Sequence, residues 1–484
     1  MSKPFSKRSQ PWARIAVYAA MTTSVVVLVG LLMLLVLGYS FNQRDGRLEQ
    51  GGLLQFGSIP TGAVVTLDEL VLGPRTNTKA TVDAGSHSVD FTLTGYRSWK
   101  KTIDISPGQI GWVNYARLVP TTLEPETVRT FQSVTSSVAS PRQNWILAQE
   151  VADRPEFELI NIQGDVVRYT TLALPDGSYT VPTDGKPQSF AIDSWSYNEN
   201  AILLRHTYGD GQLEWIYLDR ENPERSISIN ATFGVAPSKL EFGGDGSRLL
   251  FVQTDDIVRR INLDDQTLSR PLVSKVAQYT VYDEKSLTFV TTAVDGKRSV
   301  GYAVTDIAQP VEIGSYAADD KLLQASMETY FNKRYVSILY GDKLTITGGD
   351  LPTLTNKGSL KPVASVTVPA DAQQLTMGRN GRFTIVRTAD GYVTYDLELK
   401  KYDKTKWAQQ SQPQRPIQWL DDYMLWSDNG GSVRIYDFDG ANQQTIMQVV
   451  EGNAVTVSDN DEYLYGFSAG DKGIDLARVK MIIN

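Results

Sequence analysis

The segment Gly244-Asp-Gly-Ser247, followed by the apolar run Leu249–Val252, decides the fold of most of this chain. A polar Asp/Gly turn before a run of Leu, Phe and Val is typical of a β-hairpin, in which a tight turn joins two strands. A shorter alternating run precedes this turn, and a further turn and a third strand-like run, Val258–Asp264, follow it. The unit therefore predicts three consecutive antiparallel strands.

The same unit recurs eight times between Thr135 and the C-terminus. Its polar turns are Pro141–Asn144, Asn198–Asn200, Gly244–Ser247, Asp283–Ser286, Asn332–Arg334, Arg379–Arg382, Leu420–Asp422 and Asp459–Glu462. A repeat of about 40 to 50 residues built of hairpins predicts a β-propeller. We expect it to occupy residues 121–484 with eight blades, or seven if the weak unit at 332–350 merges with a neighbour. The last unit ends after its third strand, so we expect Glu126–Phe131 to supply the missing outer strand and close the ring.

The third strands carry a pattern of Ile, Tyr and a final Asp, as in EWIYLD (Glu214–Asp219) and VRIYDF (Val433–Phe438). Together with the preceding turn and apolar strand, this pattern resembles the TolB-type (PD40-like) propeller repeat. The Ser-Pro-Asp-Gly turn of that repeat occurs here in altered forms, such as Ser140-Pro-Arg-Gln143. The resemblance implies a fold and names no ligand.

An apolar segment near the N-terminus predicts a membrane anchor. Residues 15–41 contain no charge, and at 1.5 Å per residue a helix of that length exceeds the roughly 30 Å hydrocarbon core. Basic residues precede the segment, while the charges after it nearly cancel, so the N-terminus is expected in the cytoplasm and the bulk of the chain outside it. The alternative is a cleaved signal peptide, but the apolar stretch is long for one and Gly38-Tyr-Ser40 is a poor cleavage site. We therefore predict a single-pass protein of the cell membrane, with a cytoplasmic head (1–14), a transmembrane helix (15–41) and a tether (42–50).

Residues 51–120 alternate apolar and polar side chains between Gly/Pro turns, which predicts a small antiparallel β-sandwich. Three spaced motifs, Ser58–Asp68 (SIPTGAVVTLD), Gly85–Phe91 (GSHSVDF) and Gly95–Trp99 (GYRSW), resemble the PEGA domain. Thr61 stands where the family motif has Glu, and the Thr-Pro order is altered at Gly73–Thr76. The resemblance implies a bacterial surface protein and a non-catalytic module. The motif residues themselves favour structural roles, with Gly62 and Gly95 in turns and Tyr96 and Trp99 covering a small core.

The composition excludes several kinds of chemistry. The 484-residue chain has no Cys and two His, and its net charge is −8. Disulfides, thiolate metal sites and a Cys nucleophile are therefore excluded, and no His-based triad, P-loop or dinucleotide fingerprint occurs. Because Lys and Arg are not clustered outside the N-terminal head, nucleic acid is not an expected partner. We expect no cofactor, no bound metal and no catalytic residues.

One recurrence suggests a binding surface. The loop between the second and third strands carries an Asp in every unit: Asp153, Asp210, Asp255, Asp295, Asp342, Asp390, Asp428 and Asp471. In a propeller these loops gather on one face, so the eight residues are a candidate acidic binding face. Asp-Gly is also a favoured hairpin turn, which leaves turn geometry as the alternative explanation. The irregular connection Leu172–Ser189 is a second candidate, because long loops often carry function.

These patterns favour a membrane-anchored, extracytoplasmic binding or scaffold protein rather than an enzyme. The expected partners are the membrane and either a protein or a cell-envelope polymer, recognised by the propeller. Two alternatives stay open: a propeller enzyme that acts on envelope glycans, which would need carboxylates converging near the axis, and a structural subunit of an envelope assembly.

Overall fold

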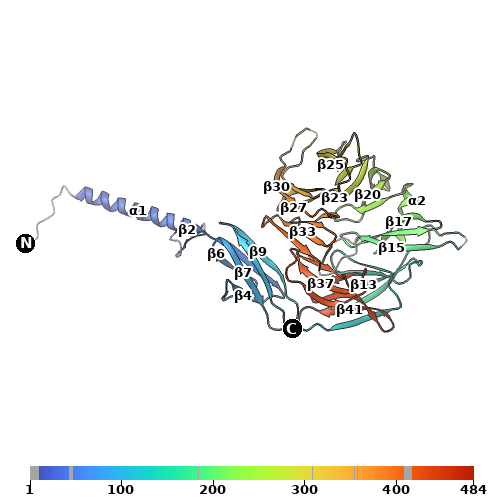
Figure 1. Cartoon of the computed structure of the whole chain (residues 1–484), viewed down its shortest axis with the longest axis horizontal. Helices are drawn as coiled ribbons and strands as arrows, with labels where there is room; N and C mark the ends of the chain where they lie inside the picture. The colour runs from blue at the N-terminus through green and yellow to red at the C-terminus, as the bar shows by residue number, and fades with distance from the viewer. Residues whose placement is uncertain are drawn as a thin grey trace, which may run out of the picture. The chain divides into compact units, whose positions relative to one another are not determined.

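The computed structural model describes residues 10–36, 38–42, 47–183, 185–307, 309–353, 355–356, 358–407 and 417–483. The chain divides into two compact units, Met1–Thr121 and Thr122–Asn484. Strands make up most of both units, apart from one long helix near the N-terminus (Figure 1). The prediction of a mainly β protein is confirmed. Most of the predicted cytoplasmic head and part of the tether lie outside the described residues.

The N-terminal helix α1 (Gln10–Val36) contains a 21-residue stretch, Arg14–Leu34, that is long and apolar enough to cross a membrane. Its described side chains are almost all exposed, which is compatible with a signal anchor or a single membrane span. The helix ends five residues earlier than expected, since Gly38 adopts a φ of +77° and strand β1 (Tyr39–Asn42) follows. Strand β1 pairs antiparallel with β2 (Arg47–Gln50), so two short strands occupy the end of the predicted transmembrane segment and part of the predicted tether.

The rest of the first unit is built of two sheets. Their strands are β3 (Gly52–Ile59), β4 (Val64–Leu67), β5 (Leu70–Val71), β6 (Thr78–Val82), β7 (Gly85–Thr92), β8 (Trp99–Ile105) and β9 (Ile110–Arg117). One sheet has the order β6-β3-β9 and the other β5-β4-β7-β8. Phe56 of the first sheet packs edge-on against Phe91 of the second, with ring centroids 6.0 Å apart, as expected of a sandwich.

The sandwich is not purely antiparallel, and that part of the prediction was wrong. Strands β3 and β9, the first and last of the domain, pair in parallel. Parallel pairing needs a long connection, and here the whole intervening domain provides it. The predicted structural roles of the motif residues are confirmed: Gly62 and Gly95 have φ angles of +92° and +85°, and Tyr96 and Trp99 are buried.

His87 ties the β4–β5 turn to the rest of the sandwich. Its Nδ1 lies 2.6 Å from Asp68 Oδ2, and its Nε2 lies 2.7 Å from the carbonyl oxygen of Asp83. Both ring nitrogens therefore face acceptors, which favours the doubly protonated ring. Burial opposes that charge, but the hydrogen bonds to Asp68 and Asp83 prevail and raise the pKa of His87 above its usual value.

Raising the pH should loosen this turn. A His whose pKa is raised by folding contributes stability below its unfolded pKa, and this contribution is lost as pH rises through the folded pKa. We therefore expect amide hydrogen exchange in Val64–Val71, corrected for intrinsic rates, to be faster at pH 8 than at pH 6. His87→Gln should abolish this pH dependence, whereas His206→Gln, in the other unit, should leave it intact. Equal pH dependence in all three proteins would contradict the assignment.

The second unit contains eight four-stranded antiparallel sheets within its described residues. The first four are β11 (Ser136–Ala139), β12 (Trp145–Gln149), β13 (Glu156–Asn161) and β14 (Arg168–Ala173); β15 (Gln188–Trp195), β16 (Ala201–Tyr208), β17 (Gln212–Asp219) and β18 (Ile227–Ser228); β19 (Lys239–Phe242), β20 (Leu249–Thr254), β21 (Ile257–Asn262) and β22 (Thr267–Leu268); and β23 (Val276–Val281), β24 (Ser286–Thr291), β25 (Lys297–Val304) and β26 (Val311–Ala317). Short helices η1 (Pro223–Arg225) and α2 (Ile229–Phe233) flank β18.

The fifth to eighth sheets follow the same plan. They are β27 (Leu323–Tyr330), β28 (Lys333–Tyr340), β29 (Lys343–Gly348) and β30 (Lys361–Thr367); β31 (Gln374–Met377), β32 (Phe383–Arg387), β33 (Gly391–Asp396) and β34 (Lys401–Lys406); β35 (Gln418–Trp419), β36 (Met424–Ser427), β37 (Ser432–Asp437) and β38 (Gln444–Gln448); and β39 (Val455–Val457), β40 (Tyr463–Gly470), β41 (Gly473–Lys480) and β10 (Pro125–Phe131). The weak repeat at 332–350 thus belongs to a complete sheet of its own, β27–β30.

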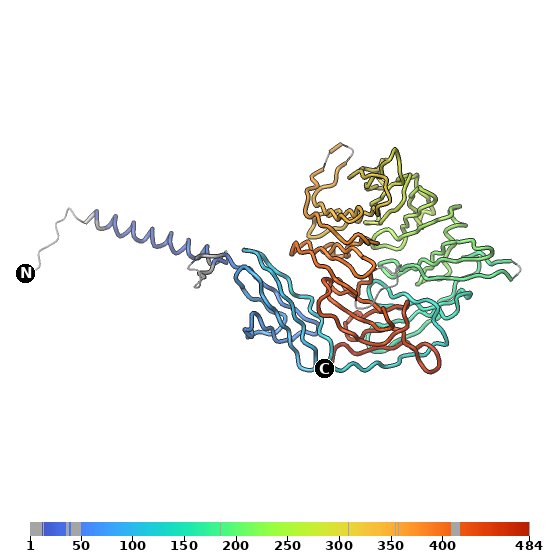
Figure 2. The backbone as a smooth tube through the Cα atoms, in the orientation of Figure 1, coloured from blue at the N-terminus to red at the C-terminus, as the bar shows by residue number. Residues whose placement is uncertain are grey.

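The eighth sheet joins the two ends of the unit. Its outer strand β10 comes from the start of the unit and pairs antiparallel with β41, as predicted from the missing fourth strand. Figure 2 shows the red C-terminal tube running beside the teal tube that begins this unit. The buried side chains of Phe131, Tyr465 and Leu476 in this sheet pack against Ile146 and Ile160 of the first sheet. The first and last sheets are therefore neighbours, an arrangement consistent with propeller blades.

Candidate functional site

We call the turns that join the first and second strands of the eight sheets the first turns. Those of seven sheets, with adjoining strand ends, surround a large cavity. The cavity measures about 690 Å³. It is lined by Pro141, Tyr197, Phe242, Gly244, Asp245, Val281, Tyr282, Asp283, Glu328, Thr329, Arg379, Asn380 and Asp422. These residues come from seven successive sheets, so no single repeat forms the site. We call it the axial mouth cavity.

A second cavity, of about 430 Å³, lies between the first strands of four sheets. Its walls include parts of β11, β35 and β39, together with Asp193 of β15, and Pro141 lines both cavities. Burial raises the pKa of Asp193, although Arg205 opposes the shift. Burial also raises the pKa of Glu328, which lines the axial mouth cavity. Each of the two cavities therefore contains a carboxyl group with a raised pKa.

Arg379 links distant sheets across the axial mouth cavity. Its Nη2 lies 3.0 Å from Asp245 Oδ1, in the first turn of the third sheet, although the two residues are 134 positions apart. Its Cζ lies 3.2 Å from the centroid of the Tyr197 ring, in the first turn of the second sheet. The neighbouring Asn380 donates from Nδ2 to the carbonyl oxygen of Asp422 at 2.9 Å. The first turns of four sheets are thus held together around the cavity.

Glu328, near the end of β27, is the most perturbed acid in the cavity. Burial raises its pKa to about 7, although Arg379 and the Thr329 amide act in the opposite direction and Asp245 adds to the rise. Among the described residues no side chain donates a hydrogen bond to its carboxylate. A partly buried carboxyl with a raised pKa and no side-chain donor is a common feature of functional sites, because such a group is costly to keep in a folded chain.

The eight Asp residues predicted from sequence lie at the opposite ends of the strands. Each occupies the turn between the second and third strands of its sheet, as expected, and antiparallel order places these turns away from the first turns. Seven are exposed, whereas Asp428 is buried and accepts a hydrogen bond from the Gly452 amide. Asp255 and Asp295 have positive φ angles, which turn geometry explains. An acidic binding face made of the exposed seven stays a prediction.

The irregular connection after β14 contacts the buried pair formed by His206 and Glu214. Thr180 donates to Glu214 from both its amide and its hydroxyl group, and Tyr179 packs edge-on against His206. His206 lies within β16 and is fully buried, with Nδ1 2.9 Å from Glu214 Oε1. The connection is therefore anchored to the second sheet.

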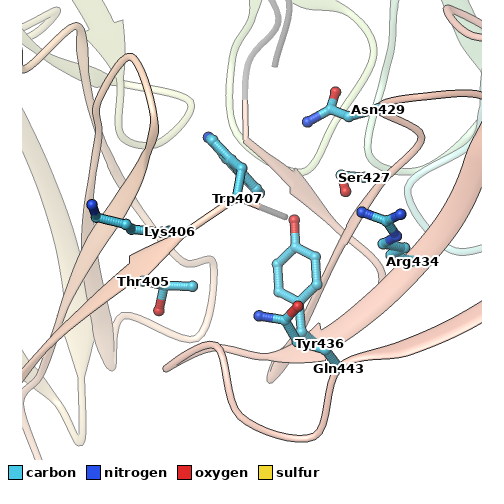
Figure 3. Close-up of a pocket in the computed structure, with 8 residues that line it drawn as sticks. All are labelled: Thr405, Lys406, Trp407, Ser427, Asn429, Arg434, Tyr436 and Gln443. Atoms are coloured by element: carbon cyan, nitrogen blue, oxygen red, sulfur yellow. The ribbon is translucent and has the colours of Figure 1, made fainter. Parts of the chain in front are cut away.

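A smaller cavity lies between β34 and the seventh sheet. Figure 3 shows the Tyr436 ring between Trp407 and Arg434. The space open to solvent-sized groups is about 10 Å³, roughly one water molecule. Trp407, Tyr392 and Tyr436 pack against one another with centroids 5.2 to 5.9 Å apart, so their role is packing. The part of the chain that the structure describes holds no group of three or more His, Asp or Glu side chains placed to bind a metal.

Residues 52–121 match the PEGA domain. This confirms the resemblance seen in the spaced motifs of the sandwich. No curated protein matches the chain. Whether the repeats are of the TolB type and the source is bacterial stays a prediction.

Solved structures that resemble the chain do so at low identity. Kluyveromyces lactis Hsv2 is 10% identical with a TM-score of 0.36, and the match covers 72% of this chain and 99% of that one. An oligogalacturonate lyase in complex with manganese is 10% identical with a TM-score of 0.38, over 59% and 87% of the two chains. A eukaryotic initiation factor is 10% identical with a TM-score of 0.40, over 69% and 94%. Matches at this level identify neither a partner nor an activity.

The cavity residues were not singled out from the sequence. Asp245, Asp283 and Arg379 belong to turns that the repeat analysis identified, but only as turns. Glu328 lies in a strand and carries no local signal. The first turns of seven sheets had to be brought together before these side chains met, and sequence spacing does not specify which turns lie opposite one another.

Proposed function

We propose that this protein is a membrane-anchored binding protein that holds an eight-bladed propeller outside the cytoplasm and binds its partner at the axial mouth cavity. The eight sheets would be the eight blades, with β10 and β41 joining the ends of the ring. The apolar helix would be the anchor, oriented by the basic residues that precede it, and the PEGA domain a non-catalytic spacer. The partner would be a protein or a cell-envelope polymer.

The observation that carries this proposal is the axial mouth cavity itself. Its volume falls in the range of roughly 300 to 1,000 Å³ common for ligand sites, and its walls combine aromatic rings with a few charged groups. Convergence of side chains from seven sheets on one cavity is what a binding site at a propeller axis requires. The partly buried Glu328 gives that site a polar group that folding alone does not need.

Photo-crosslinking in intact membranes tests the proposal. A photoreactive residue in place of Asn380, on the rim of the cavity, should crosslink the full-length chain to a defined partner. The same residue in place of Asp459, in the first turn of the eighth sheet and outside the cavity lining, should not. Crosslinking from both positions to the same extent, or from neither, would overturn the proposal.

A second candidate is an enzyme acting on envelope glycans. The observation in its favour is that Asp193 and Glu328 line the two cavities and that burial raises the pKa of both, because a carboxyl with a raised pKa is better suited to act as a general acid. The test is to incubate the full chain with purified envelope glycans and measure new chain ends. Release that is lost in both Asp193→Asn and Glu328→Gln would favour the enzyme; no release from the unaltered protein would exclude it.

A further inference from the structure

The charges lining the axial mouth cavity are unbalanced. Four carboxylates, those of Asp245, Asp283, Glu328 and Asp422, face one basic side chain, Arg379. Asp283 is engaged by its own turn, since its Oδ1 accepts hydrogen bonds from the Ser286 amide and hydroxyl groups. Asp245 is paired with Arg379, which leaves Glu328 and Asp422 for a ligand. A cavity with this excess of negative charge favours a cationic ligand.

Arg379 already occupies the kind of position that such a ligand would take. Its guanidinium group lies over the Tyr197 ring and pairs with Asp245, so an aromatic face and a carboxylate together hold a cation. Both partners of the ion pair are largely exposed, with side-chain exposures of 54% and 76%, and pairs of this kind contribute little stability. A cation from outside can therefore displace Arg379 at small cost, and Arg379 acts as an internal competitor.

Glu328 supplies the deeper counter-charge. Its carboxylate lies among buried surroundings, next to Thr329, and no described side chain hydrogen-bonds to it. The other ionisable groups that line the cavity are Arg379 and the carboxyl groups of Asp245, Asp283 and Asp422, together with the phenols of Tyr197 and Tyr282; of these, Arg379 and Asp245 act on the pKa of Glu328. An added ammonium or guanidinium group would favour the ionised form of Glu328.

The cavity is too large for one side chain. Asp245 and Asp422 are exposed and belong to the third and seventh sheets, which are half a ring apart if the eight sheets form a ring. A single lysine or arginine cannot pair with both rim acids and with Glu328. Several basic groups on one extended chain can. The exposed Asp residues at the opposite strand ends are a weaker candidate for the same ligand, because two of them already pair with Lys186 and Lys406.

We infer that the axial mouth cavity binds an extended, Lys- or Arg-rich segment of a protein partner, with Glu328 as the deep counter-ion and Arg379 displaced on binding. This rests on the proposed function, because it names the ligand class of the same site. The inference also goes beyond the proposed function, because it assigns a role to the acids of the cavity.

The test uses the full-length chain in lipid nanodiscs and a fluorescent hexa-arginine peptide, with binding followed by anisotropy at 150 mM salt. Glu328→Gln should weaken binding about tenfold at pH 8 and less than threefold at pH 6, where Glu328 is mostly protonated already. Arg379→Gln should tighten binding a few-fold by removing the competitor. Asp459→Asn is the matched control, with the same loss of charge in a first turn outside the cavity, and should change binding less than twofold.

Three outcomes would overturn the inference. Equal weakening by Glu328→Gln and Asp459→Asn would show general charge attraction. Weaker peptide binding by Arg379→Gln would show that Arg379 supports the site instead of competing with the ligand. A spermidine affinity as high as that of the peptide would identify a free polyamine as the ligand. Glu328→Gln should not fail by misfolding. A Glu whose pKa is raised by folding destabilises the folded chain increasingly as pH rises from its unfolded pKa towards 7. At pH 8 the Glu328→Gln variant should therefore be at least as stable as the unaltered chain. If crosslinking from Asn380 still captures a partner while the peptide fails to bind, the proposed function stands and only the ligand class falls.

Discussion

Replacing Arg382 by methionine is expected to lower the stability of the second unit by about 3–5 kcal/mol. Arg382 precedes β32 and is 1% exposed. It donates from Nε and Nη2 to the two carboxylate oxygens of Asp396, at 2.9 and 2.6 Å, and its Nη1 lies 3.0 Å from Glu398. Met fills much of the same volume but leaves the buried Asp396 without its counter-charge. The uncompensated carboxylate, rather than the lost packing, dominates the expected cost.

The position of Arg382 explains why the effect should reach beyond one sheet. Its guanidinium group lies 5.0 Å from the ring of Phe383 in its own sheet, and 5.8 and 5.7 Å from the rings of Tyr423 and Phe438 in the seventh. Through Glu398 it also connects to the hydroxyl group of Tyr330 in the fifth sheet. Three adjacent sheets therefore share one ion-pair network, and loss of its centre should loosen both interfaces.

Urea denaturation of the full-length chain measures this effect, with Lys285→Met as the control. Lys285 pairs with Asp306 at the surface, both side chains being more than 60% exposed, so that substitution should cost less than about 1 kcal/mol. The double variant Arg382→Met/Asp396→Asn removes the stranded charge and should recover part of the loss. If Arg382→Met and Lys285→Met cost the same, or if the second substitution adds to the damage, the buried charge is not the cause.

Short-range patterns predicted the strands, because each repeat contains its own polar turn and its own alternation of apolar and polar side chains. The run LLFV at Leu249–Val252 lies in β20, and the missing outer strand was found at β10 because counting strands left one sheet incomplete. What the sequence did not predict depends on long-range pairing. The parallel contact of β3 with β9 and the meeting of Arg379 with Asp245 both join residues far apart in the chain, and no periodicity encodes them. The strand ends were therefore predictable, and the axial site was not.

The same distinction separates the acids that turn geometry explains from those it does not. Asp295, before Gly296, has a φ of +49°, so its place is accounted for by the hairpin turn alone. Glu328 makes no such contribution: it lies in a strand, caps no turn, and is harder to ionise because it is partly buried. Burial disfavours the ionised form of Glu328, so a role in binding explains this residue better than a role in stability.

Truncating Phe131 to alanine is expected to cost about 3–5 kcal/mol, because it empties a buried site where the eighth sheet packs against the first. Phe131 ends strand β10 and is 2% exposed. Its ring lies 6.0 Å from that of Phe467 in β40, and the Arg129 guanidinium group lies 4.9 Å from it. It also packs in the cluster that joins the eighth sheet to the first. The substitution therefore weakens the junction between the first and eighth sheets, which come from opposite ends of the unit.

If β10 closes the ring, the damage should appear at both ends of the unit and little in its middle. Hydrogen exchange in Phe131→Ala is expected to rise in β41 and β12, with little change in β20 and β24. Phe331→Ala is the matched control, since Phe331 is 75% exposed at the turn between β27 and β28, and it should cost less than about 0.5 kcal/mol. Increased exchange spread evenly over all eight sheets would mean that Phe131 supports the unit as a whole and that the pairing of β10 with β41 is not a separate closure.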